Sequence, residues 1–454
     1  MENSVNEPRV PAAAPAKVFN TQADFLREFP LTGPDTLGGK MLRRYWHPVC
    51  LSKDLQDIPY PVRMLSEDLV AFRGLDGKVG LIGDRCAHRC ASLQYGQIRA
   101  EGLECSYHGW TYDRKGACVR MPLEPLNTPL LAKVKQKWYP VEEWAGIVWT
   151  YMGPGGDSPP PLPKIDILAR TDGELVVERG DFRNYNYQNF LENFADMGHV
   201  YVLHMLAPGE TPEDVAPHCD TSVDIEWRHI THKSFDTSFG MKSVLVHNTS
   251  DPDKKFVNTW SIAPPAHWRF GGISAGLPPD FTDDRRESGG MLRIIDDGHF
   301  EMFRHTLVRP GNFRSTFFPR DSDKSRGLAE GTAGPREKKD YDYRKYPAWE
   351  GRPPLEDLVI QESQGVIPPR EHELLATSDT GVVMLRRLWR RSMEAVAQGR
   401  EPFQIKVDEN GIFKVDTFKG FAKASEMKLG PENMPSSEDG RGLIRDTNGK
   451  AVFA

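Results

Sequence analysis

The residues Cys86-Ala87-His88 and Cys105-Ser106-Tyr107-His108 decide how the first half of this chain is organised. Two cysteines and two histidines form two short pairs, one at each end of a connecting segment. Each pair can direct both of its side chains toward one point. Two thiolates with two imidazoles suit either a zinc ion or an iron–sulfur cluster in which two histidines replace two cysteines on one iron.

Zinc is the less favoured interpretation of these four residues. Structural zinc sites usually pair cysteine with cysteine and histidine with histidine, whereas here each pair contains one of each. One cysteine and one histidine from each of two loops is the pattern of a Rieske [2Fe–2S] cluster. Cys86 and Cys105 are then expected to bind the ferric iron. His88 and His108 are expected to bind the redox-active iron, where neutral imidazoles raise the potential.

The composition of the 454 residues limits the classes of protein to consider. A net charge of −6 argues against nucleic-acid binding, which needs a basic surface. No run of about eighteen apolar residues is present, so no membrane span is expected. Residues 1–17 lack a basic start and an apolar core, which predicts a disordered tail rather than a signal peptide. Six cysteines are too few for a disulfide scaffold, so we expect a cytoplasmic protein that uses some of them as metal ligands.

Strand and turn signals divide the chain into two folded parts. Short strand patterns, with a hairpin turn at Asp76-Gly77, place both Cys/His pairs on loops of a small antiparallel β domain, 40–155. A Gly/Pro-rich linker, 156–174, leads to a larger domain, 175–430, in which we expect an antiparallel sheet flanked by helices, the best of them at Thr380–Gln398. The fold class is therefore α+β. The remaining predicted segments are a tail with a short helix (1–39), a surface insertion or lid (319–354) and a C-terminal arm (431–454).

A second candidate site is the run from Glu192 to His204, whose two histidines are His199 and His204. On a straight helix the two histidines would point about 140° apart. They can share a metal only if the helix ends or bends between them, and the run Val200-Tyr201-Val202 favours such an ending. Two histidines with one carboxylate form the facial triad of non-haem Fe(II) oxygenases. From periodicity alone, a structural role for both histidines stays open.

The sequences around these motifs resemble a known family. Arg85-Cys86-Ala87-His88-Arg89, Cys105-Ser106-Tyr107-His108-Gly109-Trp110 and Arg43-Arg44-Tyr45-Trp46-His47-Pro48 are similar to large (alpha) subunits of Rieske non-haem iron ring-hydroxylating oxygenases. The likeness is greatest to the phthalate dioxygenase-type branch, which includes aryl O-demethylases. Cys90 departs from the family, because many members have glycine there, and it is interpreted as a small buried thiol, with a redox role left open.

The resemblance implies roles for the residues of the second site. His199 and His204 are expected to bind Fe(II), and Asn193 to lie near the iron. Asp196 is expected to hydrogen-bond the cluster ligand His108 of a neighbouring subunit.

The third iron ligand should be a distant carboxylate. Asp379 resembles the family's position best, although it is also a natural N-cap for the helix that follows. We expect the arginines of the run 386–391 to form a solvated face of that helix around a buried Trp389. The other candidate carboxylates are Asp357, Glu362, Glu371 and Glu373.

The resemblance also implies a reaction and partners. Because no dinucleotide-binding motif is present, we expect the chain to bind neither NAD nor flavin and to receive electrons from a separate reductase with a flavin and a ferredoxin-type cluster. It would be a terminal oxygenase that inserts O2-derived oxygen into an aromatic acid. The expected reaction is ring hydroxylation or O-demethylation, for example of a lignin-derived methoxylated biaryl, or dioxygenation of a phthalate- or phenoxybenzoate-like carboxylate. A homotrimer or a multiple of it is expected. The alternatives from other classes are an electron carrier and a zinc-stabilised protein without oxygenase activity.

Overall fold

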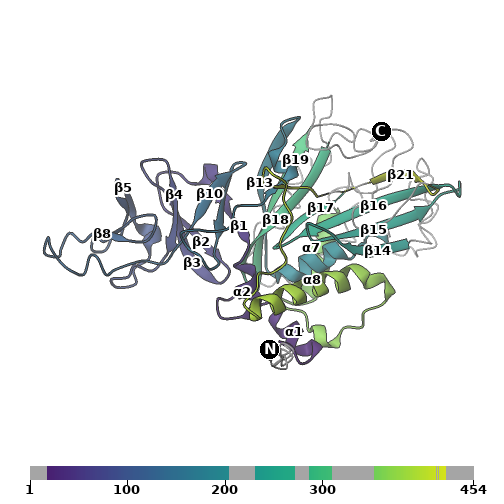
Figure 1. Cartoon of the computed structure of the whole chain (residues 1–454), viewed down its shortest axis with the longest axis horizontal. Helices are drawn as coiled ribbons and strands as arrows, with labels where there is room; N and C mark the ends of the chain where they lie inside the picture. The colour runs from purple at the N-terminus through teal and green to yellow at the C-terminus, as the bar shows by residue number, and fades with distance from the viewer. Residues whose placement is uncertain are drawn as a thin grey trace, which may run out of the picture.

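The computed structural model describes residues 18–203, 231–270, 286–308, 352–415, 417 and 419–425. These residues form two parts, a smaller one built from strands β1 to β11 and a larger one built around a broad sheet (Figure 1). The predicted α+β class is confirmed. In the described ranges, no helix is long and apolar enough to cross a membrane.

The smaller part contains three antiparallel sheets, with the strand orders β1-β11-β10, β2-β3-β4-β9 and β5-β6-β7-β8. Gly77 has a φ of 80° and closes the hairpin between β3 and β4, so the turn predicted at Asp76-Gly77 is confirmed. The strands are β1 Trp46–Leu51, β2 Tyr60–Met64, β3 Glu67–Arg73, β4 Val79–Gly83, β5 Gln97–Arg99, β6 Gly102–Glu104, β7 Thr111–Tyr112, β8 Cys118–Arg120, β9 Trp138–Tyr139, β10 Val141–Trp144 and β11 Ile147–Tyr151.

The larger part is organised by an antiparallel sheet whose described strands run in the order β13-β19-β18-β17-β16-β15-β14, with β21 paired to β16. Its strands are β13 Glu174–Arg183, β14 Thr231–Asp236, β15 Met241–Asn248, β16 Lys254–Ala263, β17 His267–Phe270, β18 Arg286–Asp296, β19 His299–Val308 and β21 Lys419–Lys423. A short parallel pair, β12 Lys164–Ile165 and β20 Ile412–Phe413, lies outside this sheet.

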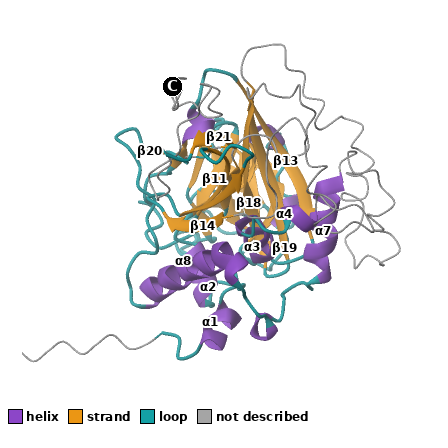
Figure 2. Ribbon diagram, turned by 90° about the vertical axis from the view of Figure 1, so that its right-hand side faces the viewer, coloured by secondary structure: helices purple, strands orange, loops and turns teal. Residues whose placement is uncertain are grey.

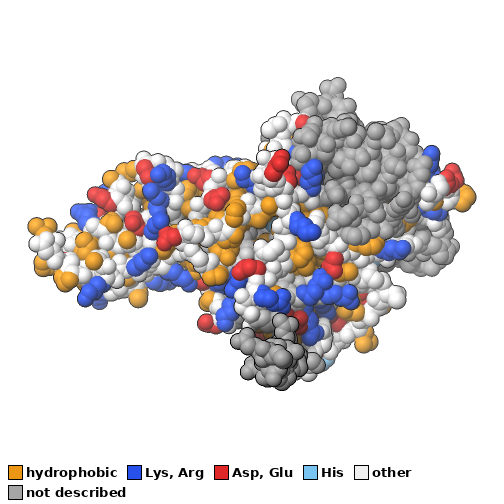
Figure 3. All heavy atoms as spheres, viewed as in Figure 1, with side chains coloured by type: hydrophobic (Ala, Val, Ile, Leu, Met, Phe, Trp, Pro, Cys, Tyr) orange, Lys and Arg blue, Asp and Glu red, His pale blue; other side chains and the backbone are white. Residues whose placement is uncertain are grey.

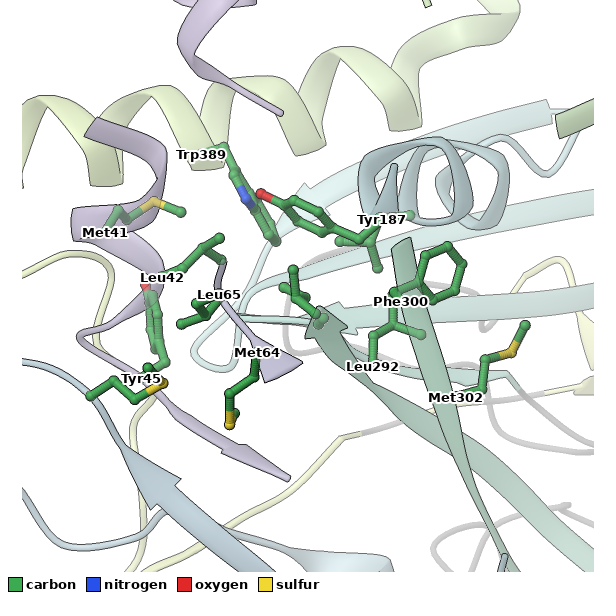
Figure 4. Close-up of a cluster of buried hydrophobic side chains, with 14 of the residues drawn as sticks. Met41, Leu42, Tyr45, Met64, Leu65, Tyr187, Leu292, Phe300, Met302 and Trp389 are labelled. Atoms are coloured by element: carbon green, nitrogen blue, oxygen red, sulfur yellow. The ribbon is translucent and has the colours of Figure 1, made fainter. Parts of the chain in front are cut away.

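Helices cover one face of the large sheet (Figure 2). They are α1 Gln22–Glu28, α2 Leu37–Leu42, α3 Tyr187–Ala195, α4 Val200–Leu203, α7 Arg352–Ser363 and α8 Thr380–Ala397. The helix predicted at Thr380–Gln398 is confirmed as α8, whose apolar residues recur at helical spacing and face the core. Trp389 of α8 meets Leu42 of α2 and Phe300 of the sheet in one core (Figure 4). Phe25 of α1 and Phe29 just after it are fully buried in the same core, so this short helix is packed onto the folded protein.

The two parts are joined by backbone and side-chain hydrogen bonds. The N–H groups of Leu65 and Ser66, in the turn between β2 and β3, donate to the carbonyls of Ile294 and Ile295 on β18, at 2.9 and 2.8 Å. Arg293 of β18 donates through Nη1 to the carbonyl of Val49 on β1, at 2.9 Å. The predicted insertion at 319–354 overlaps the start of α7. Its residues up to 351, and the predicted arm at 431–454, lie outside the described residues.

Candidate active site

The two Cys/His pairs lie on two loops with the same backbone hydrogen bonds. In the first loop, Cys86 donates its N–H to the carbonyl of Ala91 (2.9 Å) and accepts at its own carbonyl from the N–H of Cys90 (2.8 Å). The second loop repeats both bonds around Cys105, with partners at the same offsets, at 2.8 and 3.0 Å. The prediction that Cys90 is buried is wrong, because the tight turn leaves this residue exposed.

The four predicted cluster ligands are brought together by these loops. The rings of His88 and His108 lie 4.5 Å apart between centroids, with their planes at 72°. Cys86 and Cys105 are each 2% exposed and pack in one core cluster. The hydroxyl of Tyr112 lies 3.2 Å from Sγ of Cys86, and a hydrogen bond of this kind tunes the potential of a cluster. The contact with Tyr112 was not anticipated from the sequence.

The chemistry of these side chains fits a [2Fe–2S] cluster. Burial raises the pKa of Cys105, backbone N–H groups of Tyr107 and His108 lower it, and the adjacent Cys86 raises it. Two adjacent buried thiols become thiolates readily only when positive charge lies between them. Nδ1 of His108 is buried and has no hydrogen-bond partner within the part of the chain that the structure describes, as expected of a nitrogen directed at a metal.

The backbone of the second site breaks before His199 rather than after it. Helix α3 ends one residue before Asp196, whose Oδ1 accepts a hydrogen bond from the N–H of Gly198 at 2.9 Å. Helix α4 then begins, and the N–H of Leu203 donates to the carbonyl of His199 at 2.7 Å. The run Val200-Tyr201-Val202 is itself helical, in α4 Val200–Leu203, so the helix does not end within it. His204 lies outside the described residues.

His199 contacts a carboxylate through one ring nitrogen and a carbonyl through the other. Its Nδ1 is hydrogen-bonded to the backbone carbonyl of Asp196. Its Nε2 lies 3.5 Å from Oδ1 of Asp357, and the same oxygen accepts a hydrogen bond from Nδ2 of Asn193 at 3.4 Å. A carbonyl at Nδ1 requires the proton to be there, which leaves the lone pair of Nε2 directed at the carboxylate side. Nε2 of His199 and Oδ1 of Asp357 are together suited to bind a metal ion.

Asp379 is used differently. Its Oδ2 accepts a hydrogen bond from the N–H of Ala376 at 2.6 Å, within the 3-10 turn Thr377–Asp379 that precedes α8. The contacts of Asp379 among the described residues do not include His199. Asp357, one of the five carboxylates left open by the sequence, lies beside His199, and the role of Asp379 as an iron ligand stays a prediction.

Aromatic side chains line the neighbourhood of His199. The rings of His199 and Trp260 lie 6.3 Å apart, and Phe194 stacks on Trp260 at 4.9 Å. Trp268, on the strand next to that of Trp260, lies 5.4 Å from Phe194. A Cβ at Gly290 would meet the indole of Trp268 at 2.5 Å, so a glycine is required there. Phe194 and Trp268 are buried in the hydrophobic core, so the half-buried Trp260 is the member of this group that lies next to His199.

Glu192 lies one turn before Asp196 and is buried between two arginines. Arg370 donates to Oε2 through Nε (3.0 Å) and Nη2 (2.7 Å), and Arg386 donates to Oε1 through Nε (2.5 Å). Burial would raise the pKa of Glu192, but the two guanidinium groups lower it overall. The expectation that Arg386 lies on a solvated face is wrong, because it is 7% exposed and paired.

Similarity to known proteins agrees with this geometry. Residues 45–133 match the model of the Rieske [2Fe-2S] domain. Phenoxybenzoate dioxygenase subunit alpha of Ectopseudomonas oleovorans is 33% identical over 389 residues, which cover 82% of this chain and 85% of that protein. The chain belongs to the Rieske oxygenases. This oxygenase is therefore an oxidoreductase whose cluster supplies one-electron transfer when bound, and the zinc-protein and electron-carrier alternatives are wrong.

Other relatives differ in what their names say they act on. The tert-butanol monooxygenase / tert-amyl alcohol desaturase oxygenase subunit of Aquincola tertiaricarbonis is 31% identical, covering 94% of this chain and 87% of that protein. The 5,5'-dehydrodivanillate O-demethylase oxygenase subunit of Sphingobium sp. (strain NBRC 103272 / SYK-6) is 30% identical, covering 82% and 80%. The solved structure of the Pseudomonas putida CBB5 NdmA QL mutant with theobromine has the same fold as this oxygenase. Its TM-score is 0.57 at 21% identity, covering 82% of this chain and 98% of that chain.

Proposed function

We propose that this oxygenase inserts O2-derived oxygen into an aromatic acid, by O-demethylation or ring hydroxylation, at an Fe(II) bound by His199, His204 and Asp357. Such an iron supplies the open coordination positions at which O2 reacts. The proposal is carried by one observation, the 3.5 Å approach of His199 Nε2 to Asp357 Oδ1 beside the ring of Trp260. Asn193 orients Asp357 by donating to the same oxygen.

The proposed substrate class rests on the aromatic ring beside His199 and on the names of two relatives. The half-buried Trp260 lies next to His199, and the buried rings of Phe194 and Trp268 pack around it. Phenoxybenzoate and dehydrodivanillate, which appear in the names of two relatives, are both aromatic acids.

The electron route that we propose crosses between subunits. In Figure 1 the cluster-bearing strands β5 to β8 lie at the end of the molecule remote from α7, which carries Asp357. Asp196 is 30% exposed and its backbone carbonyl contacts His199, so it can connect the surface to this ligand. We propose that Asp196 accepts a hydrogen bond from the cluster ligand His108 of the next subunit in a head-to-tail homotrimer.

The surface of the cluster end fits such an assembly. Apolar side chains are exposed at this end (Figure 3). Tyr107, whose ring lies 3.8 Å from that of His108, is exposed, and Leu126, between β8 and β9, is fully exposed. Exposed apolar groups of this kind mark protein contacts. A separate reductase with a flavin and a ferredoxin-type cluster is the proposed electron donor. The proposed location is the cytoplasm, whose reducing conditions suit free thiols.

The proposed function is tested by NADH-driven O2 uptake with a reductase of this type. The substrates are a methoxylated biaryl acid, phenoxybenzoate, phthalate and tert-butanol. Formaldehyde released in step with O2 uptake identifies O-demethylation, and a hydroxylated product without formaldehyde identifies hydroxylation. Turnover of tert-butanol without turnover of any aromatic acid would contradict the proposed substrate class.

A further inference from the structure

We infer that the buried ion pair between Glu192 and Arg370 positions the carboxylate of Asp357 against His199. This inference rests on the proposed iron site and deepens it. His199 comes just after α3, whereas Asp357 belongs to α7. Asn193 of α3, which donates a hydrogen bond to Asp357, lies 164 positions before it in the sequence. A ligand pair on two separate helices keeps its geometry only if other contacts fix one helix against the other.

Polar groups on α3 and in the two residues just before it make these contacts. Asn189 and Asn193 are four positions apart, so they project from the same face of the helix. They face α7 and the chain just after it. The hydrogen bonds are Asn186 N to the carbonyl of Val366 (2.8 Å), Asn189 Nδ2 to the carbonyl of Gly365 (3.3 Å), Asn193 Nδ2 to Asp357 Oδ1 (3.4 Å) and Tyr185 Oη to Gln361 Oε1 (2.7 Å). Glu192 adds the charged contact to this set.

The pair of Glu192 and Arg370 is desolvated on both sides. The side chain of Arg370 is 1% exposed and that of Glu192 is 12% exposed. Arg370 donates twice to the carboxylate and once, at 3.2 Å, to Oδ1 of Asn189. Two buried charges with this geometry stay paired, because separating them would leave each unpaired away from water. Arg370 opens the 3-10 helix Arg370–His372 that follows α7, so its bond fixes the far end of the α7 segment on α3.

Arg386 offers a comparison within the same cluster. It donates to the other oxygen of Glu192 at 2.5 Å and pairs with Glu373 at 2.7 Å. Its side chain is 8% exposed, so it is nearly as buried as Arg370. Arg386 belongs to α8, however, and α8 carries none of the proposed iron ligands. Loss of Arg386 should therefore weaken packing without moving Asp357, whereas loss of Arg370 should do both.

The experiment compares Arg370→Met with Arg386→Met in the full-length protein. Fe(II) affinity of the mononuclear site is measured by competition with a chelator, and the site geometry by the EPR spectrum of its nitric oxide adduct. The visible absorbance of the cluster serves as an internal control. We expect about tenfold or greater loss of Fe(II) affinity and an altered EPR spectrum in Arg370→Met, as for other residues that orient metal ligands. Arg386→Met should bind Fe(II) like the wild type at a similarly lowered melting temperature.

Two milder variants keep the test decisive if the methionine variants do not fold. Glu192→Gln retains the shape of the side chain, and Arg370→Lys retains one charge but not the two-point contact. Both should weaken Fe(II) binding by less than Arg370→Met. Equal Fe(II) affinity in the two arginine variants, with unchanged EPR spectra, would overturn the inference. A wild-type chain that binds no iron beyond its cluster would instead overturn the proposed iron site, and this inference with it.

Discussion

Cys90 and Gly109 occupy the same place in the two cluster loops. Each donates its N–H to the carbonyl of the cluster cysteine four residues earlier, at 2.8 and 3.0 Å. Each has a positive φ, 58° at Cys90 and 73° at Gly109. Glycine adopts this conformation without strain, whereas a residue with a Cβ is disfavoured in it. The first loop therefore carries a backbone strain that the second loop avoids.

Replacement of Cys90 by glycine should stabilise the smaller part by about 1 kcal/mol. The expected result is a rise of about 2–4 °C in the temperature at which the visible absorbance of the cluster is lost. Cys90→Ala is the matched control, because it removes the sulfur and keeps the strained Cβ, so it should change little. Equal stabilisation by both variants would show that the exposed thiol, not the backbone, is responsible.

Asp357→Ala and Asp379→Ala should separate the two candidates for the third ligand. Loss of the carboxylate beside His199 should lower iron from about three to about two atoms per chain and abolish turnover, with the cluster spectrum intact. Asp379→Ala removes the hydrogen bond to Ala376 and should cost about 1 kcal/mol of stability while iron is retained. Iron loss in Asp379→Ala alone would return the role to Asp379.

The difference between these two aspartates shows what the sequence could predict. The cluster loops were predictable because all four ligands lie within one short stretch, at spacings that few other sites share. The hairpin at Asp76-Gly77 and helix α8 follow from local turn chemistry and apolar periodicity. The approach of Asp357 to His199 depends on how α7 packs on α3, which no local spacing encodes.

The pattern of charged residues in the sequence also does not reveal which side chains form ion pairs with one another. The arginines around Arg386 follow the spacing of a solvated helix face, yet Arg386 is buried because Glu192, from a distant helix, lies opposite it. A buried glutamate in α3 could be suspected only from its position between apolar residues that face the core. Likewise, nothing local to Tyr112 indicates that its hydroxyl reaches Cys86.

The proposed electron transfer between subunits predicts that two inactive variants restore each other's activity when mixed. His108→Ala should lack a working cluster and Asp357→Ala should lack iron. In mixed head-to-tail trimers with random composition, about one quarter of the contacts join an intact cluster to an intact iron, so about one quarter of wild-type turnover should return. Transfer within one chain would restore none, because neither chain has both sites.

Asp196→Asn, placed in the His108→Ala chain, tests the proposed bridge in the same mixture. The hydrogen bond to a carboxylate is stronger than that to a neutral amide, so the restored turnover should fall by about tenfold. The same substitution placed in the Asp357→Ala chain should have no effect, because the iron side of that chain is already inactive. Equal effects from both placements would exclude Asp196 as the acceptor of the bridge.

The hydroxyl of Tyr112 should raise the potential of the cluster. A donor 3.2 Å from Sγ of Cys86 stabilises the more negative, reduced state. Tyr112→Phe should therefore lower the midpoint potential by about 40–80 mV, which corresponds to about 1–2 kcal/mol in a one-electron couple. Tyr95→Phe, at an exposed tyrosine of the same part, is the control. Redox titration followed by visible absorbance measures both, and equal potentials in wild type and Tyr112→Phe would contradict the effect.

His267 lies buried between the two parts of the chain, where its ring stacks on that of Trp149 at 5.9 Å with the planes within 2°. Burial, with a contribution from nearby His47, lowers the pKa of His267 to about 4. In the unfolded chain a histidine has a pKa of about 6.5. The folded protein therefore binds fewer protons than the unfolded chain below pH 6.5. Its stability is complete above that pH and is lost as the pH falls toward 4.

Between pH 7 and pH 5 this one histidine should cost about 2 kcal/mol of folding free energy. His267→Phe can still stack on Trp149 and cannot titrate, so its melting temperature should fall less than that of the wild type over this range. His372→Gln is the control, because that side chain is 78% exposed and its removal should leave the pH dependence unchanged. If the melting temperatures of the wild type and of His267→Phe fall equally with pH, the acid sensitivity comes from groups other than His267. A flatter curve would identify protonation of His267, where the cluster-bearing part meets the large sheet, as a source of the acid sensitivity.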